Sequence, residues 1–402
     1  MKRKQKASLK RGIIVASIVV FAVIVAFVAL VFLTSPSGKL EVIFSKQFDT
    51  NIQEIKIDPQ GTNYFLGTPD GNLIILSAGG EETAKLDVGS QVLEIVIEPK
   101  ARIAVVRTLT KITGFTYDGK LVWEHKIQDY LPEKLQILPR EKLGVYLRSG
   151  RGDEPMAALF DVETGKELSR TLIKVNETDI NPTFMPDGES IVFEVVPGMV
   201  AEVGLTPDLP MFWQAHLDTY DGRFRNIEIE ITHSNLVVCY FRLDEKRNTN
   251  ESFRELYVFD ATNIPEAESG TPEKDVFWKK RIDGDLSVVQ VNSTNDNILV
   301  QAQSVEIFDR SGNLLASETT DSGFYFSSLG DSRYMSSFFL EDSSGSNISV
   351  LLFAKGIGRE GVLWRRTETM SNFLLPVVDP KCERVLMVSP DQKEVMLLKL
   401  IP

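Results

Sequence analysis

The sequence predicts an all-β protein, a β-propeller of eight four-stranded blades preceded by one transmembrane helix. Three observations lead to this prediction. Residues 13–33 are apolar, short β-branched and aromatic runs separated by turns fill the chain after Gly38, and these runs recur as larger units. The turns return about every 8–12 residues, which is typical of all-β folds. The units recur about every 35–50 residues, which is the range of propeller blades.

The N-terminal segment predicts a membrane anchor. Residues 13–33 (IIVASIVVFAVIVAFVALVFL) contain no charge, proline or glycine. As a helix they would extend about 31 Å, close to the thickness of the bilayer core. Residues 1–12 hold six positive charges and no acid, which predicts a basic cytoplasmic tail and an extracytoplasmic C-terminal domain at 39–402. Residues 34–38 (TSPSG) form a short linker. A cleaved signal peptide is the alternative, and the length of the apolar run argues against it.

The charge of the body excludes one class of partner. The chain has 44 Lys+Arg and 56 Asp+Glu, and the tail holds six of the positive charges. The remaining 38 positive charges against 56 negative ones give residues 39–402 a formal charge of −18. Because neutralising phosphates requires clustered Lys and Arg, we expect no binding to nucleic acid.

The repeat units follow one another along the body. Each opens with an apolar strand, turns at a polar corner and continues through further strands to a Gly turn. The units are 52–77, 92–127, 135–170, 180–227, 234–282, 297–317, 334–366 and 374–400, with irregular insertions at 197–212, 243–254 and 261–275. Seven blades are the alternative count because of those insertions, and a pair of β-sandwiches would not explain the repeats.

The two ends of the body are predicted to pair. The last unit supplies only three strands, whereas KLEVIFSKQF (39–48) is an additional strand before the first unit. An open ring would leave an unpaired sheet edge, which promotes aggregation. We therefore expect 39–48 to complete the last blade and close the ring.

Three segments carry a family resemblance. FDVETGKELSR (160–170) and YDGKLVWEHKI (117–127) resemble the repeats of pyrroloquinoline-quinone-type and WD-like propellers. FMPDGESIVFEV (184–195) resembles the Pro-Asp-Gly repeat of propellers in periplasmic translocation proteins. The resemblance implies the fold across most of 39–402 and leaves the function open, because this fold serves many functions.

No catalytic, metal or cofactor site is predicted. His125, His216 and His233 stand alone in the sequence, and no nucleophile motif occurs with its companions. We expect Cys239, within an apolar strand, to be buried, and Cys382, within a turn, to be more exposed, with both thiols free. Asp-rich turns at 70–72 and 283–285 are interpreted as ordinary turns, and no cofactor is expected.

The tryptophans and their basic neighbours are the candidate contact positions. The expected structural role of each tryptophan is to pack one blade against the next. The functional alternative is cation–π recognition of a carbohydrate or anionic ligand, or contact with lipid headgroups. These candidate positions are Trp213, Trp278, Lys279, Lys280, Arg281, Trp364, Arg365 and Arg366. The three insertions are a further candidate surface, and Asn176, Asn250, Asn292 and Asn347 match the N-glycan acceptor pattern.

These features predict a non-enzymatic, single-pass membrane protein. Its propeller would act as a protein-binding or scaffold module in an envelope or cell-surface assembly, with the bilayer contacted through 13–33. A surface sensor for a glycan or other ligand is the alternative, and a quinoprotein-type dehydrogenase is a third. The lining of the central channel would discriminate between them, because buried carboxylates or histidines there would favour chemistry.

Overall fold

The computed structural model describes most of the predicted body. The described residues are 39–127, 129–149, 154–173, 182–196, 198–206, 208, 210–217, 226–242, 253–262, 271–283, 288–292, 294–319, 324–341, 348–357, 362–369, 374–389 and 391–401. Among them no helix is long and apolar enough to cross a membrane. The predicted span at 13–33 lies outside these residues.

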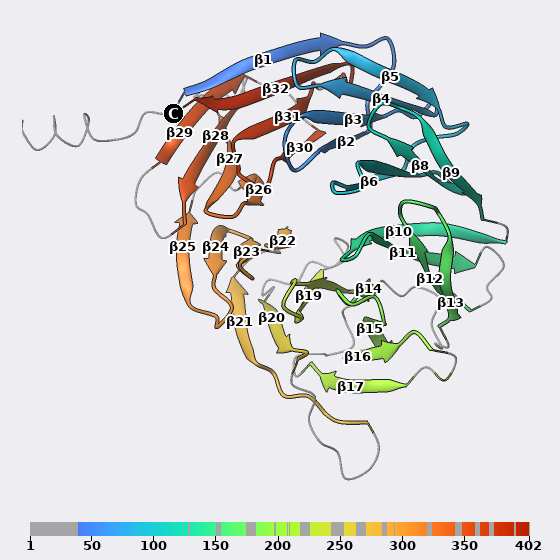
Figure 1. The fold of residues 1–402 in the computed structure, drawn as a ribbon. Helices are drawn as coiled ribbons and strands as arrows, with labels where there is room; N and C mark the ends of the chain where they lie inside the picture. The colour runs from blue at the N-terminus through green and yellow to red at the C-terminus, as the bar shows by residue number, and fades with distance from the viewer. Residues whose placement is uncertain are drawn as a thin grey trace, which may run out of the picture.

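The described chain forms eight four-stranded antiparallel sheets, arranged as the blades of a ring (Figure 1). From the inner to the outer edge, blades 1 to 4 are β2 (Glu54–Ile57), β3 (Asn63–Gly67), β4 (Asn72–Ser77) and β5 (Glu82–Asp87); β6 (Glu94–Glu98), β7 (Ile103–Arg107), β8 (Lys111–Thr116) and β9 (Leu121–Lys126); β10 (Tyr130–Leu138), β11 (Lys142–Ser149), β12 (Met156–Asp161) and β13 (Glu167–Leu172); and β14 (Thr183–Phe184), β15 (Ser190–Val196), β16 (Met199–Gly204) and β17 (Met211–His216).

Blades 5 to 8 repeat this order. They are β18 (Asn226–Ile231), β19 (Leu236–Arg242), β20 (Phe253–Asp260) and β21 (Trp278–Asp283); β22 (Val288–Val291), β23 (Ile298–Gln301), β24 (Ser304–Phe308) and β25 (Leu314–Thr319); β26 (Phe324–Leu329), β27 (Arg333–Glu341), β28 (Ile348–Gly356) and β29 (Val362–Thr369); and β30 (Leu374–Val378), β31 (Arg384–Val388), β32 (Glu394–Ile401) and β1 (Lys39–Gln47).

The ring closes as the sequence predicts. The N-terminal strand β1 pairs antiparallel with β32, from Lys39 opposite Ile401 to Gln47 opposite Glu394. Figure 1 shows these two ends of the chain side by side. Each inner strand contacts the inner strands of the two neighbouring blades, including β30 with β2. The eight-blade prediction is therefore confirmed and the seven-blade alternative is wrong.

Several predicted boundaries are wrong, and the units predicted to begin at 234, 297 and 334 omit the inner strands β18, β22 and β26. The segment 217–227 was assigned to the end of the fourth unit, but Asn226 already begins β18, the inner strand of blade 5. The segment 197–212 is not an insertion, because it contains β16 and the start of β17. The described part of the third insertion, 271–275, lies along β17 through a parallel bridge between Gln214 and Glu273.

The hydrophobic core lies between neighbouring blades. One cluster, for example, joins Ile55 and Ile57 of β2 to Leu386 and Val388 of β31. Tight Gly turns add a second kind of contact. Gly165, at a φ of +69°, lies so close to the Trp123 ring of the preceding blade that a Cβ would be 2.4 Å from Cγ. The Trp123 indole also donates a hydrogen bond to the carbonyl of Val162, at 2.6 Å. The predicted role of tryptophan between blades is confirmed at this position.

The direction of the strands defines two faces of the ring. Because the strands of a blade alternate in direction, the turns from first to second and from third to fourth strand lie on one face, here called face 1. In blade 1 these turns are 58–62 and 78–81. The turn 68–71 and the connections between blades lie on the opposite face, face 2. The N-terminal residue of β1, Lys39, lies at face 1, because it is paired with Ile401 at the end of the third strand of blade 8.

Candidate functional site

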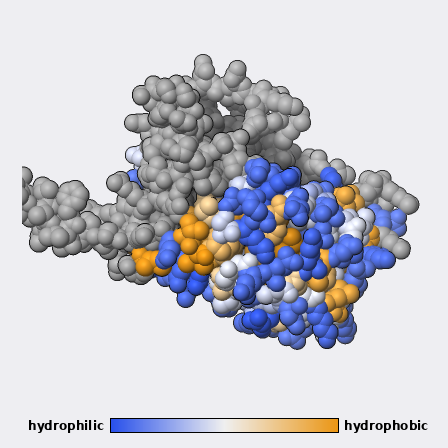
Figure 2. Space-filling view, turned by 90° about the horizontal axis from the view of Figure 1, so that it is seen from above, coloured by the Kyte–Doolittle hydropathy of each residue, from blue (hydrophilic) through white to orange (hydrophobic). Residues whose placement is uncertain are grey.

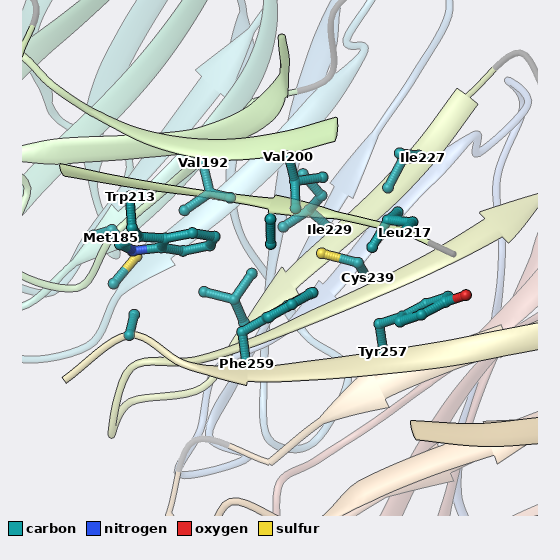
Figure 3. Packing of buried hydrophobic residues seen from close by; sticks show 13 residues of the cluster. Met185, Val192, Val200, Trp213, Leu217, Ile227, Ile229, Cys239, Tyr257 and Phe259 are labelled. Carbon is teal, nitrogen blue, oxygen red and sulfur yellow. The ribbon is translucent and has the colours of Figure 1, made fainter. Parts of the chain in front are cut away.

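Trp213 belongs to the core and not to a contact surface. Its side chain is fully buried in the cluster between blades 4 and 5, as Figure 3 shows. The indole Nε1 donates a hydrogen bond to Glu202, and the ring stacks on Phe259 with the centroids 5.9 Å apart. Lys274, from the third insertion, places its ammonium 5.7 Å from the Trp213 ring centroid. The prediction that Trp213 lies at a contact surface is therefore wrong, because the neighbouring blade covers its side chain.

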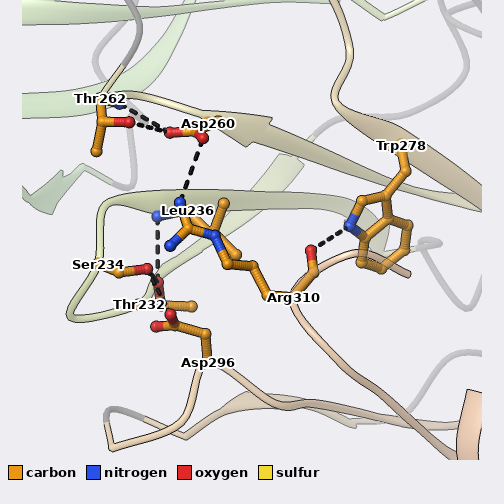
Figure 4. Close-up of polar contacts among 8 residues, drawn as sticks. All are labelled: Thr232, Ser234, Leu236, Asp260, Thr262, Trp278, Asp296 and Arg310. Atoms are coloured by element: carbon orange, nitrogen blue, oxygen red, sulfur yellow. Dashed lines mark hydrogen bonds and ion pairs between the residues drawn. The ribbon is translucent and has the colours of Figure 1, made fainter. Parts of the chain in front are cut away.

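The basic run on β21 also packs against rings. The indole of Trp278 donates a 2.9 Å hydrogen bond to the carbonyl of Arg310 in the next blade (Figure 4). The ammonium of Lys280 lies 5.4 Å from the Phe308 centroid, and that of Lys279 lies 5.8 Å from the Tyr257 centroid. Arg281 is exposed on the same strand. Trp278 thus has the structural role expected of the tryptophans, while Lys279 and Arg281 also lie at the surface.

The second basic run occupies another part of the ring. Trp364, Arg365 and Arg366 are positions of β29, the outer strand of blade 7, which contacts β1. The two basic runs are on the outer strands of blades 5 and 7, with blade 6 between them. The structure therefore does not assemble the eight candidate positions into one site.

A polar ring at the inner strands was missed by the sequence analysis. On β2, β6 and β18, isoleucines pack toward the preceding blade, whereas the alternating glutamates and lysine belong to no hydrophobic cluster. The signal was present as alternation of Glu and Ile in EIKI (54–57), EIVI (94–97) and NIEIEI (226–231). An alternation of period two places one set on each face of a strand.

The polar side chains on these strands bind the following blade. Gln136 of β10 forms two hydrogen bonds of 2.9 Å with the backbone of Phe184. Glu94 of β6 accepts a hydrogen bond from the backbone N–H of Leu135 at 3.2 Å and an ion pair from Arg107 at 2.7 Å. Gln290 of β22 accepts one from the N–H of Leu329 at 3.0 Å. In these blades, a polar side chain on the inner strand is hydrogen-bonded to a backbone group of the next blade.

Lys134 of β10 is a half-buried cation of this polar ring. Its Nζ donates a 3.0 Å hydrogen bond to Thr183 of blade 4. Burial lowers the pKa of Lys134, and the carboxylates of Glu230, Glu228 and Glu94 oppose that shift. Burial likewise raises the pKa of Glu230, against the attraction of Lys134. Glu94 contacts a cation and a backbone N–H group, and Lys134 attracts Glu228 and Glu230, a pattern that fits structural bridging.

The histidines and Asn292 form no metal or glycan site among the described residues. Among the described residues, no group of three or more His, Cys, Asp or Glu side chains could hold a metal ion. The ring of His125 contacts the carbonyl of Gly165, and His216 and His233 are exposed. Asn292 is 7% exposed and its side chain closes a turn by accepting from the N–H of Thr294, so it is a poor glycan acceptor.

The two cysteines are free and buried, so the expectation that Cys382 is more exposed is wrong. Cys382 lies in the first turn of blade 8, but the turn of blade 7 covers it. Its Sγ is 3.7 Å from the carbonyl oxygen of Arg333, and a Cβ on Gly330 would lie 2.7 Å from that sulfur. The prediction for Cys239, in β19, is confirmed.

Comparisons with known proteins show similarity at the level of the fold. No family model matches the chain, and no curated protein sequence matches it. Among solved structures, the C-terminal WD40 domain of Sif2 is 11% identical with a TM-score of 0.61, covering 91% of this chain and 99% of that one. BamB from Moraxella catarrhalis is 13% identical with a TM-score of 0.52, covering 90% and 100%. The WD40 domain of SCAP from fission yeast is 9% identical with a TM-score of 0.54, covering 90% and 98%. Together with the closed ring, these matches show that the body has the β-propeller fold, which it shares with the WD40 domains and with BamB.

Proposed function

We propose that this chain is a single-pass membrane protein whose extracytoplasmic β-propeller acts as a protein-binding or scaffold module in an envelope or cell-surface assembly. The observation that carries the proposal is the closed ring itself, joined through β1 to an apolar segment long enough to span a bilayer. Neighbouring blades are held by buried clusters and by side chains that bridge to backbone groups, which makes the ring a rigid frame for its connecting loops. Loops on a rigid frame commonly carry recognition.

The orientation in the membrane rests on the charges beside the span. Six positive charges precede residues 13–33 and Lys39 follows them, so the positive-inside rule places the N-terminus in the cytoplasm. An introduced thiol at exposed Leu109 should react with an impermeant maleimide on intact cells. Reaction only after the membrane is permeabilised would contradict the extracytoplasmic location.

A crosslinking experiment tests the scaffold function. The tagged full chain is crosslinked in its native membranes, solubilised and purified, beside a tagged control that contains only residues 1–38. We expect a protein that crosslinks to propeller residues and is recovered with the full chain but not with the control. Recovery of the bait alone, or of the same proteins with both baits, would argue against a scaffold.

The polar ring favours a second candidate function, that of a ligand or glycan sensor. Lys134 and the carboxylates of Glu228 and Glu230 offer hydrogen-bonding groups near the axis. A glycan that raises the melting temperature of the wild-type chain should fail to do so for Lys134→Met and still do so for the control Lys120→Met. For the dehydrogenase alternative, reconstitution with quinone and calcium should yield no new visible absorbance.

A further inference from the structure

The point where β1 begins limits how the ring can sit on a bilayer. Lys39 is at face 1 and Gln47 is at the other end of the nine-residue strand. That strand extends about 30 Å from one face to the other. The linker 34–38 between the predicted span and Lys39 can extend at most about 18 Å. If face 2 were turned to the membrane, the linker would have to cross the depth of the ring, which is longer than the linker can reach.

Among the described residues, more of the exposed apolar side chains lie on face 1 than on face 2, where Leu109, Leu172 and Val196 are exposed. Leu121 and Leu314 are the first residues of outer strands, Leu168 is the second residue of β13, and Phe277 immediately precedes β21. All four follow the turn from third to fourth strand, so they form a rim on face 1 in blades 2, 3, 5 and 6. Figure 2 looks at the edge of the ring and shows hydrophobic residues interrupting a largely hydrophilic surface. Val42 and Ile43, each 39% exposed at the bulge of β1, lie midway along that strand and so between the two faces.

We propose that the propeller lies with face 1 against the lipid surface, with this apolar rim at the headgroup region and face 2 turned to partner proteins. The inference rests on the membrane anchor of the proposed function. The linker alone would also permit the ring to stand on edge at blade 8. The apolar residues in blades 2, 3, 5 and 6 favour the flat orientation, because only that orientation brings distant blades to the interface, where apolar side chains gain from leaving water.

Of the four glycan acceptor motifs, Asn292 is the one that lies among the described residues. It belongs to a face 1 turn, and its side chain is buried, so this motif offers no accessible acceptor on face 1.

Single thiols on the full chain can test the orientation. Leu121 on face 1 and Leu109 on face 2 are matched, because both are leucines of blade 2 and they are 54% and 52% exposed. Both native cysteines are fully buried, so a maleimide fluorophore should label only the introduced thiol. Leu121→Cys, Leu109→Cys and Ile43→Cys are labelled and reconstituted into phosphatidylcholine vesicles that contain a nitroxide-headgroup lipid. Leu314→Cys provides a second rim position in case one variant folds poorly.

The expected result is loss of most fluorescence at positions 121 and 314, a smaller loss at position 43, midway between the faces, and little loss at position 109. Loss at position 43 alone would show a ring standing on edge and would overturn the proposal, as would equal loss at 109 and 121. Flotation of the vesicles distinguishes failure of the proposed function. A chain that does not float with the vesicles has no anchor, and then both proposals fall.

Discussion

At the residue scale, the first turn of nearly every blade depends on one unusual backbone conformation. In seven of the eight blades the described turn between first and second strand places a residue at positive φ, and these residues are Gly61, Arg102, Arg140 with Glu141, Gly188, Asn235, Asp296 and Cys382. Only glycine adopts this region without strain, and Asn and Asp tolerate it better than most other residues. The turn geometry is therefore set by the repeat and only in part by the local residue.

Glycines in the third turn are limited by space as well as by conformation. Gly80 has a φ of +82°, and a Cβ there would lie 2.4 Å from Cγ of Phe44. We expect Gly80→Ala to lower the free energy of unfolding by about 2–3 kcal/mol, because strain and overpacking add. The adjacent Gly79→Ala is the matched control, since its Cβ would meet only Ser77 Oγ at 3.9 Å. Urea unfolding of the full chain in detergent measures both, and equal effects would contradict the packing explanation.

Glu202 is a buried carboxylate whose charge is costly. It accepts hydrogen bonds from Ser190 at 2.6 Å and from the indole of Trp213. Burial nevertheless raises its pKa above the usual value for glutamate. The folded protein therefore binds this proton more tightly than the unfolded chain does.

This raised pKa predicts a pH dependence. The stabilisation from the proton bound to Glu202 is complete below the pKa of the unfolded chain, about 4.3. It is lost as the pH rises through the higher pKa of Glu202 in the folded protein. Glu202→Gln can accept the indole hydrogen bond with its amide oxygen and donate to the Ser190 hydroxyl with its amide nitrogen, without the charge, so we expect it to raise stability at pH 7 and to remove this part of the pH dependence. Glu202→Ala should cost about 2–4 kcal/mol, because it leaves donors unpaired and opens a cavity. Melting temperatures from pH 4 to pH 7 test this, and parallel curves for Glu202→Gln and wild type would contradict it.

At the element scale, the closing strand acts through one of its faces. Phe44 of β1 packs against Tyr64 of blade 1, with ring centroids 5.6 Å apart, and against Gly80. The adjacent Ile43 is exposed at the bulge. The strand therefore completes blade 8 with its backbone and fastens blade 8 to blade 1 with its side chains.

Two neighbouring substitutions should separate these roles. Phe44→Ala should lower stability by about 2 kcal/mol, because a half-buried aromatic contact between blades is lost. Ile43→Ala should change it by less than about 0.5 kcal/mol, since the side chain is 39% exposed and, unlike Phe44, does not pack in the cluster between blades 8 and 1. Thermal unfolding monitored by circular dichroism measures the difference. A larger effect at position 43 would show that the bulge, and not the packing face, secures the closure.

At the scale of the whole molecule, closure makes distant blades depend on one another. Each blade packs on two neighbours, and β1 removes the free edge that an open ring would expose. The thiols of Cys239 in blade 5 and Cys382 in blade 8 report on two separate parts of the ring. Burial raises the pKa of Cys382 to about 12, so neither exposure nor acidity favours its reaction in the folded state.

The thiols should therefore react together. With Ellman's reagent we expect no reactive thiol in the native full chain and two in the unfolded chain. Both should appear over the same range of urea concentration if the ring opens as a unit. Mass spectrometry of alkylated peptides assigns each site. Reaction of Cys382 well before Cys239 would show that the last blade detaches independently.

The limits of sequence-based prediction follow from particular residues. The turn signals and strand lengths identified the propeller, and the missing fourth strand of the last unit identified β1 as its partner. Trp213 and Cys382 were misjudged, because their burial depends on a neighbouring blade that is remote from their local sequence. The polar ring had a local signal in the Glu–Ile alternation, but its partners are backbone groups of the following blade.

The sequence by itself determined the all-β repeat, the acidic body, the apolar segment before it and the pairing of the two ends of the body. The strands, turns and apolar segment follow from local periodicity and turn chemistry, and the pairing of the ends follows from counting strands, because the last unit lacks one and the segment before the first unit supplies one. Only the tertiary structure decided the blade boundaries at 217–227, which aromatic rings lie between blades, and which apolar residues share face 1. These depend on how blades pack around a closed ring, and a geometric condition on the whole chain leaves no signature in any single segment.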